Sequence, residues 1–287
     1  MKKFCLVAIA LLASGNSLAG TQTWNFTNGG SLTSGFGNTL SLTSGTGGDQ
    51  ITLDVSAWAS TDESCNDNGN YDNSLPDPDP CIKNAELKRW SSGLGIVNRD
   101  EFYNKKTGAP QHAIDNIKNG GGANDFDYEM VLLTFSEEVN LTGFNIGWSL
   151  CGSSSSNCNI LQYSDNVNAK DADVSVLGHN GSKQDFFNTD TKWSDITNQG
   201  WQHISNYSSL AENESVSVSS PLYSTHWLVG AYNNIFGGNM SLDNDAFKLA
   251  GLTTATREPS NPGTVSAPAT FGIFGALAFG LIYRRRK

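Results

Sequence analysis

Apolar and polar positions alternate with a period of two in several short segments of this chain. The clearest is 51–57, and 173–177 and 215–218 follow the same pattern. A period of two places one face of a strand against a core and the other toward solvent, so each segment is predicted to be a half-buried β-strand. The run 130–135 is apolar at five of its six positions, which is typical of a central strand.

The polar stretch 137–140 separates this run from a second apolar segment, 141–148, so a hairpin of two strands is predicted here. Ser-Leu-Thr-Ser-Gly occurs at 31–35 and again at 41–45, which predicts two short neighbouring strands. No long part of the body has a period of 3.6 residues. The predicted fold class is all-β, an antiparallel β-sandwich of jelly-roll type with an N-terminal signal helix and a C-terminal membrane helix.

The two ends of the chain carry apolar segments of a different kind. Lys2 and Lys3 precede the apolar run 4–13, and 17–19 has the small-x-small form of a signal-peptidase site. Near the other end, 271–283 is uncharged and is followed by four cations. This segment is short for a membrane helix, but the uncharged stretch extends back to 265 and terminal cations can snorkel. The alternative, a core helix, is disfavoured by the basic cluster Arg284, Arg285, Arg286 and Lys287.

These signals predict four parts. They are a signal peptide at 1–19, a β-sandwich body at 20–256, a flexible linker at 257–264 and a C-terminal sorting signal at 265–287. The last part divides into a motif at 265–270, a membrane helix at 271–283 and a basic cluster at 284–287. The basic cluster is expected to stay on the cytoplasmic side of the membrane.

Charge narrows the range of partners. The two terminal signals hold six of the 18 basic residues and none of the 28 acidic ones, which leaves the body with 12 against 28 and a formal charge of −16. Such a surface repels nucleic acid and anionic lipid, so no nucleic-acid partner is expected. It suits an extracellular protein and attracts divalent cations.

Four cysteines remain after signal-peptide removal, and an even number in an exported protein predicts two disulfides. Three pairings are open. The two local ones, which each close a polar loop, are favoured, and the absence of Cys-x-x-Cys makes a zinc site the weaker alternative. The residues are Cys65, Cys81, Cys151 and Cys158.

No catalytic motif stands out, so the chain is not expected to be an enzyme. The histidines are isolated in sequence and are interpreted as structural or surface residues: His112, His179, His203 and His226. His112, three residues before Asp115, is the one that could line a site. Glu137 and Glu138 are adjacent on a strand and point to opposite faces, unlike the facing carboxyls of a glycosidase.

Two binding hypotheses remain for the body. The first is calcium in the acidic loop 62–80, since Ca²⁺ takes six to eight oxygen ligands from a turning chain. The candidate ligands are Asp67, Asp72, Asp77 and Asp79, with the pairs Asp171 and Asp173, and Asp243 and Asp245, as further candidates.

The second hypothesis is carbohydrate binding on exposed aromatic rings. Trp58 has the phase of the polar positions of its strand and is expected to face outward, and Trp193 and Trp201 lie in polar sequence. The remaining tryptophans of the body are Trp24, Trp90, Trp148 and Trp227.

The tail resembles the sorting signal of exosortase substrates, the PEP-CTERM class. The motif Val265, Ser266, Ala267, Pro268, Ala269 and Thr270 stands where that class commonly has Val-Pro-Glu-Pro-Ala-Thr, so the signal is a variant one. Segments 130–148, 171–177 and 227–249 are similar to exosortase-dependent surface proteins of the XDP type. The resemblance implies an exported protein, linked to exopolysaccharide or biofilm, with no catalytic residues to carry over.

The sequence therefore predicts an exported cell-surface or extracellular-matrix protein with a structural or adhesive role and polysaccharide as a candidate ligand. Its processing partners would be signal peptidase and an exosortase-type enzyme, after a transient stay in the inner membrane. Two alternatives stay open. One is a secreted hydrolase that acts on polysaccharide, and the other is a stably anchored single-pass membrane protein.

Overall fold

Antiparallel strands make up most of the chain that the structure describes. The computed structural model covers residues 20–28, 32–45, 50–60, 81–103, 112–117, 127–149, 172–181, 186–187, 191–242 and 245–257. The strands are β1 (Thr21–Asn25), β2 (Thr39–Ser44), β3 (Ile51–Ser60), β4 (Ile82–Asn84), β5 (Glu86–Trp90), β6 (Gly93–Val97), β7 (Ile114–Asp115), β8 (Glu129–Ser149), β9 (Ala172–His179), β10 (Trp201–Leu210), β11 (Ser215–Ser217), β12 (Ser224–Ala231) and β13 (Ala246–Thr256). The helices are α1 (Arg99–Tyr103), α2 (Trp193–Ile196), η2 (Thr197–Gln199) and η3 (Asn234–Phe236). The predicted all-β class is confirmed.

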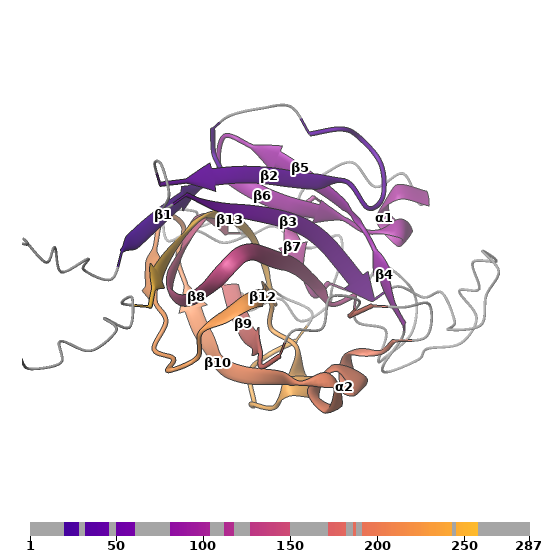
Figure 1. Cartoon of the computed structure of the whole chain (residues 1–287). Coiled ribbons are helices and arrows are strands. Elements are labelled where there is room, and N and C mark those ends of the chain that lie inside the picture. The colour runs from indigo at the N-terminus through magenta and orange to yellow at the C-terminus, as the bar shows by residue number, and fades with distance from the viewer. Residues whose placement is uncertain are drawn as a thin grey trace, which may run out of the picture. The chain divides into compact units, whose positions relative to one another are not determined.

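Strand β8 organises the sheet. The thirteen strands hydrogen-bond into one sheet whose main path runs β10-β9-β12-β8-β13-β6-β5. The first part of β8 pairs with β3 and β12, and its second part pairs with β13 and β11. Figure 1 shows β8 in the middle of the molecule, with β2, β3, β5 and β6 above it and β9, β10 and β12 below.

The hairpin predicted at 130–148 is wrong, because the whole segment is the single strand β8. Only residues 136–138 are exposed, and pairing continues on both sides of them. Val139 is fully buried, and the Asn140 side chain donates hydrogen bonds to the carbonyl oxygens of Ser220 (2.6 Å) and Leu222 (2.7 Å). The polar residues at this point are therefore a short solvated stretch of a strand and not a turn.

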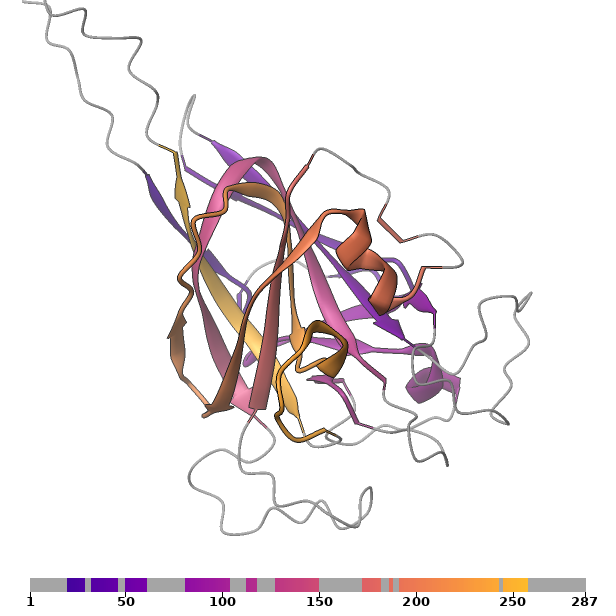
Figure 2. The same ribbon diagram turned by 90° about the horizontal axis from the view of Figure 1, so that it is seen from below.

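The central strands are buried on both faces. Val131 and Leu133 of β8 belong to the main core, whereas Met130 and Leu132 belong to a second core with Trp193 of α2. Figure 2, seen from below, shows the short helices lying against these strands. The prediction of a central strand at 130–135 is confirmed. In β9, which was expected to be half-buried, all eight residues are buried. On its outer face Leu177 joins the second core, and Asp173 and Ser175 are hydrogen-bonded to β10.

The period-two prediction for β3 is confirmed, with exposed or partly exposed residues alternating with buried ones as far as Trp58. Its partner β2 is the second copy of the repeated pentapeptide. The first copy was also expected to be a strand, but its described residues, 32–35, lie in a loop that we call the 32–38 loop. The side chain of Asn38 fixes this loop to β5 and replaces strand pairing there.

Residues Thr21–Thr256 form one compact unit. No helix among the described residues is long and apolar enough to cross a membrane. The predicted signal peptide at 1–19, the sorting motif at 265–270, the membrane helix at 271–283 and the basic cluster at 284–287 lie outside the described residues, so each of them stays a prediction.

Candidate functional site

The tryptophans separate into buried and partly exposed groups. Trp193 and Trp201, which lie in polar sequence, have only 0% and 2% of their area exposed. Both belong to the second core, where Trp201 packs against His179 and Phe186. Polar residues surround them in sequence, but aromatic residues surround them in the fold. Trp24 and Trp227 are also buried, which leaves Trp58, Trp90 and Trp148 partly exposed.

One side of the Trp58 ring is covered by a neighbouring ring. It is partly exposed, as its phase in β3 predicted, but its ring lies 4.6 Å from that of Phe187. Its indole N–H donates to the Ser56 hydroxyl at 3.0 Å. The aromatic platform expected at this position is therefore covered on one side by a neighbouring ring.

A polar pocket lies at the edge strand β5. Its volume is about 260 Å³, and it lies between the 32–38 loop and β5. Hydroxyl groups come from the loop, and a carboxylate, an ammonium and a guanidinium come from the strand. The lining residues are Leu32, Thr33, Ser34, Glu86, Leu87, Lys88 and Arg89.

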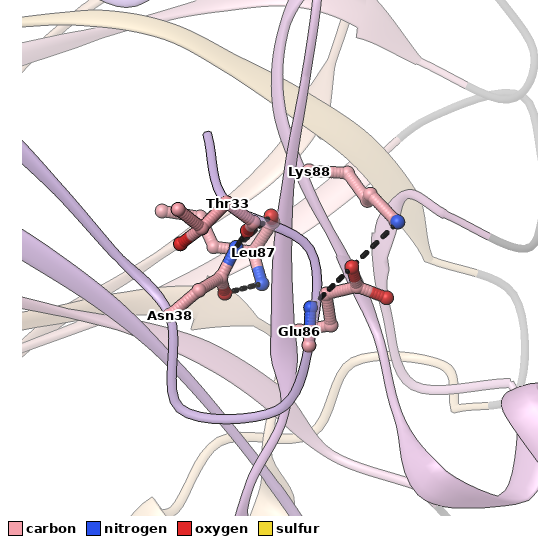
Figure 3. A network of polar contacts seen from close by, with 6 residues as sticks. Thr33, Asn38, Glu86, Leu87 and Lys88 are labelled. Atoms are coloured by element: carbon pink, nitrogen blue, oxygen red, sulfur yellow. Dashed lines mark hydrogen bonds and ion pairs between the residues drawn. The ribbon is translucent and has the colours of Figure 1, made fainter. Parts of the chain in front are cut away.

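Asn38 lies behind the pocket lining and ties the loop to the strand (Figure 3). Its amide accepts from the Leu87 backbone N–H (2.7 Å) and donates to the Leu87 carbonyl oxygen (2.9 Å), as a neighbouring strand would. It also donates to the Thr33 carbonyl oxygen at 2.6 Å. One buried side chain therefore closes the sheet edge and holds the loop, and the edge strand is shielded from other chains.

Glu86 fastens the other side of the loop. One carboxylate oxygen accepts from the Gly35 backbone N–H (2.8 Å) and from the Lys88 ammonium (2.7 Å) (Figure 3). Gly35 has φ of +123°, which glycine adopts without strain. The charged pair is thus part of the pocket wall, with both partners at fixed positions.

Beyond the pocket, the face of β5 continues into a cluster of tryptophan and lysine. Trp90 shares a face with Glu86 and Lys88 because alternate residues of a strand point the same way. The Lys248 ammonium lies 3.9 Å from the centre of the Trp90 ring and 5.4 Å from that of Trp148. Lys248 and Trp148 are directly paired across β13 and β8.

His112 stacks against Trp90, with ring centres 5.9 Å apart and planes 19° apart. Burial lowers the pKa of His112, the charges of Lys88 and Lys248 lower it further, and Glu86 opposes them. Burial also lowers the pKa of Lys248. These effects place two cations and one carboxylate within electrostatic reach of the His112 ring.

The other three histidines are not part of the Trp90 cluster. His203 is exposed, whereas His179 and His226 are buried beside Phe186. Both ring nitrogens of His179 contact backbone carbonyl oxygens, those of Gly181 (3.1 Å) and Gln199 (3.0 Å). The structural interpretation of these two residues fits such packing, and His112, the one that could line a site, lies beside Trp90.

The environment of His226 makes stability depend on pH. Burial, and then the neighbouring His179, lower the pKa of His226 to about 4. The folded state therefore binds its proton less well than the unfolded chain, whose histidine has a pKa of about 6.5. We expect the contribution of His226 to be complete above pH 6.5 and to be lost as the pH falls toward 4.

Urea unfolding at pH 7 and pH 4.5 measures this loss. The difference between the two pH values should be smaller in His226→Gln than in the wild type, and His203→Gln, at an exposed position, should keep the wild-type difference. An equal loss in wild type and His226→Gln would contradict the assignment.

The candidate calcium ligands fall into two groups. Asp67, Asp72, Asp77, Asp79, Asp171 and Asp243 lie outside the described residues. The structure brings Asp173 and Asp245 together, because the Asp245 carboxylate accepts from the Asp173 backbone N–H at 2.7 Å. Among the described residues, no group of three or more histidine, cysteine or acidic side chains is arranged to hold a metal ion.

A second set of buried acids lies at the start of β8. Glu129 is fully buried, and its carboxylate accepts from the Asp115 backbone N–H at 3.1 Å. Burial raises the pKa of Glu129 well above its usual value, and the charges of Asp115, Glu101 and Asp127 raise it further. The environment therefore favours the neutral carboxylic acid.

The cysteines and the acidic pair complete the set of predicted residues. Cys81 is fully buried and disulfide-bonded. The other three cysteines, Cys65, Cys151 and Cys158, lie outside the described residues, so the pairing stays a prediction. Glu137 and Glu138 are exposed on β8.

Comparisons with known proteins add little. No protein-family model matches the chain, and no curated protein matches it. A solved structure of a DUF4465 family protein from Bacteroides ovatus is similar at 10% sequence identity, over 83% of this chain and 99% of that chain, with a TM-score of 0.29. A likeness at this score supports no inference about the chain.

Proposed function

We propose that this chain is a non-catalytic, exported protein of the cell surface or extracellular matrix, and that its β-domain binds polysaccharide at the β5 pocket. The observation that carries the binding proposal is the pocket itself. Hydroxyl and charged groups converge there within about 260 Å³, and Trp90, two residues after Lys88 on the same strand, is partly exposed. Sugars present hydroxyl groups for hydrogen bonds and apolar faces for aromatic rings, and pockets with a few convergent polar groups are the usual binding sites.

Export rests on the N-terminal signal and on the tail, with signal peptidase and an exosortase-type enzyme as the processing partners. Mapping both termini of the mature protein from its native host by intact mass tests it. Loss of 1–19 and of the segment after about 265–270 would support sorting by such an enzyme. A retained Arg284–Lys287 end would support the stably anchored alternative.

We also propose that the sheet is a β-sandwich of jelly-roll type. The different partners of the two parts of β8 support a sheet that turns back on itself. A crystal structure in which the strands before and after residue 136 lie in one open layer would overturn this proposal.

The binding proposal predicts a specific loss. Arg89→Ala should weaken binding of the host's exopolysaccharide about tenfold, because it removes a charged hydrogen-bond donor from the pocket. Affinity electrophoresis of the mature protein in gels that contain the polymer measures this loss. Arg257→Ala, which removes an exposed arginine side chain outside the pocket lining, is the control.

Two results would contradict the proposal. Equal retardation of the wild type and Arg89→Ala in the polymer gel would show that the polysaccharide does not bind at the pocket. New reducing ends in polymer incubated with the wild type would favour the alternative, a secreted hydrolase.

A further inference from the structure

The ammonium group of Lys248 has an unusual environment. It lies over the rings of Trp90 and Trp148, and the side chain is partly buried. Within the described part of the chain it has no hydrogen-bond or ion-pair partner, whereas nearby Lys88 is paired with Glu86. A partly desolvated ammonium gains a cation–π attraction from each ring but still lacks a counter-charge.

The backbone beside this cluster is held in a costly conformation. His112 has a backbone φ of +73°, a value that residues other than glycine seldom adopt. Its Nδ1 atom is buried without a hydrogen-bond partner. Strain and an unsatisfied polar atom that persist together are features that collect at functional sites.

Glycine makes room for this arrangement. A Cβ atom on Gly95 of β6 would lie 1.9 Å from the His112 carbonyl oxygen and 3.1 Å from the Trp90 ring. The close approach of His112 to the sheet therefore requires glycine at this position. The residues around Lys248 form a fitted group and not a chance contact of surface side chains.

The local charge is opposite to that of the body. The body carries a formal charge of −16, yet the cations Lys248 and Lys88 both act on His112 at this face. Glu86 is the acid that acts on His112, and it is already occupied by Lys88 and the Gly35 N–H. An incoming anion would therefore find Lys248 as an uncompensated cation.

We infer that Lys248, with Trp90, Trp148 and His112, forms an anion subsite that takes the acidic group of a charged polysaccharide. The inference rests on the proposed function and adds its ligand class: a polymer whose sugars carry carboxylate or sulfate. The sugar ring would contact the β5 pocket while its anionic group replaces water at the Lys248 ammonium. A charge-assisted hydrogen bond in such a partly dry place is stronger than one in water.

Two matched polymer pairs test the subsite on the mature protein in EDTA, which removes bridging cations. Polygalacturonate is compared with its methyl ester, and dextran sulfate with dextran. The wild type should bind the charged member of at least one pair about tenfold or more tightly than the neutral member. The pair that shows the preference identifies the anion as carboxylate or sulfate.

Lys248→Met keeps an apolar stem between the two rings and removes the charge, and Lys248→Arg keeps the charge. In Lys248→Met the preference for the charged polymer should disappear while affinity for the neutral polymer and the melting temperature stay near wild type. Lys248→Arg should retain the preference. Raising the salt concentration should shrink the wild-type preference, because salt screens the charge.

The outcomes separate this inference from the function on which it rests. Equal binding of charged and neutral polymers by the wild type overturns the subsite and leaves the proposed function in place. A preference unchanged in Lys248→Met, or an equal loss of both polymers in that variant, also overturns it. If neither these polymers nor the host exopolysaccharide is retarded at any concentration, the proposed function fails and the subsite fails with it.

Discussion

Replacing Asp245 by alanine is expected to lower the free energy of unfolding by about 2–5 kcal/mol, because two buried donors lose their acceptor. Asp245 is fully buried. Its carboxylate accepts from the Asn116 side-chain amide at 2.6 Å and from the Asp173 backbone N–H at 2.7 Å. It thus joins the start of β13 to the segment after β7 and to β9.

The Asn116 side chain extends this connection, since its amide also donates to the Tyr232 carbonyl oxygen at 2.9 Å. Loss of the Asp245 carboxylate from this amide would therefore disturb the end of β12 as well. Urea unfolding of the mature protein measures the loss, with Glu137→Ala as a control that removes an exposed acid. A decrease below 1 kcal/mol for Asp245→Ala would show that water replaces the carboxylate and that this network is not needed for the fold.

Replacing Asn38 by alanine is expected to loosen the 32–38 loop at Leu87 and to distort the pocket, while Gly35 stays bonded to Glu86. Three hydrogen bonds of the Asn38 amide are lost, and the Leu87 N–H and carbonyl at the sheet edge lose their partner. We expect a stability loss of about 1–3 kcal/mol and a fall in polysaccharide affinity of more than about tenfold. Affinity electrophoresis and urea unfolding of the same protein give both values.

The neighbouring variant Thr39→Ala, at an exposed position, should leave both values unchanged. If Asn38→Ala loses stability but binds polymer as the wild type does, the 32–38 loop is not part of the polysaccharide site. Such a result would separate the loop from the ligand.

Local pattern was enough to predict some elements of this fold. The alternation at 51–57 predicted β3, and the continuous apolar run at 130–135 predicted a strand inside the sheet, because burial on one or both faces is written in consecutive residues. The same signal failed at 136–140. Three exposed polar residues resemble a turn, and only the partners of Val139 and Asn140 on β12, β13 and the 218–223 segment show that pairing continues.

The candidate site was harder to predict, since its parts come from distant segments. Trp148 and Lys248 are one hundred residues apart and meet only through the register of β8 and β13. Trp193 and Trp201 have polar neighbours in sequence. Trp201 is buried against Phe186 and His179, and Trp193 packs against Phe187 and Phe236. One local signal was available: the sequence Lys88-Arg89-Trp90 joins two cations and an aromatic ring in a body with few cations.

Hydrogen-exchange mass spectrometry of the mature protein, with and without saturating host exopolysaccharide, tests whether the β-domain binds polysaccharide at the β5 pocket. If it does, we expect slower exchange in the 32–38 loop and in Glu86–Trp90 when polymer is bound. Exchange in Trp201–Leu210, at the opposite edge of the sheet, should change little. Slower exchange confined to Trp201–Leu210, or no change anywhere at saturation, would contradict a polysaccharide site at β5.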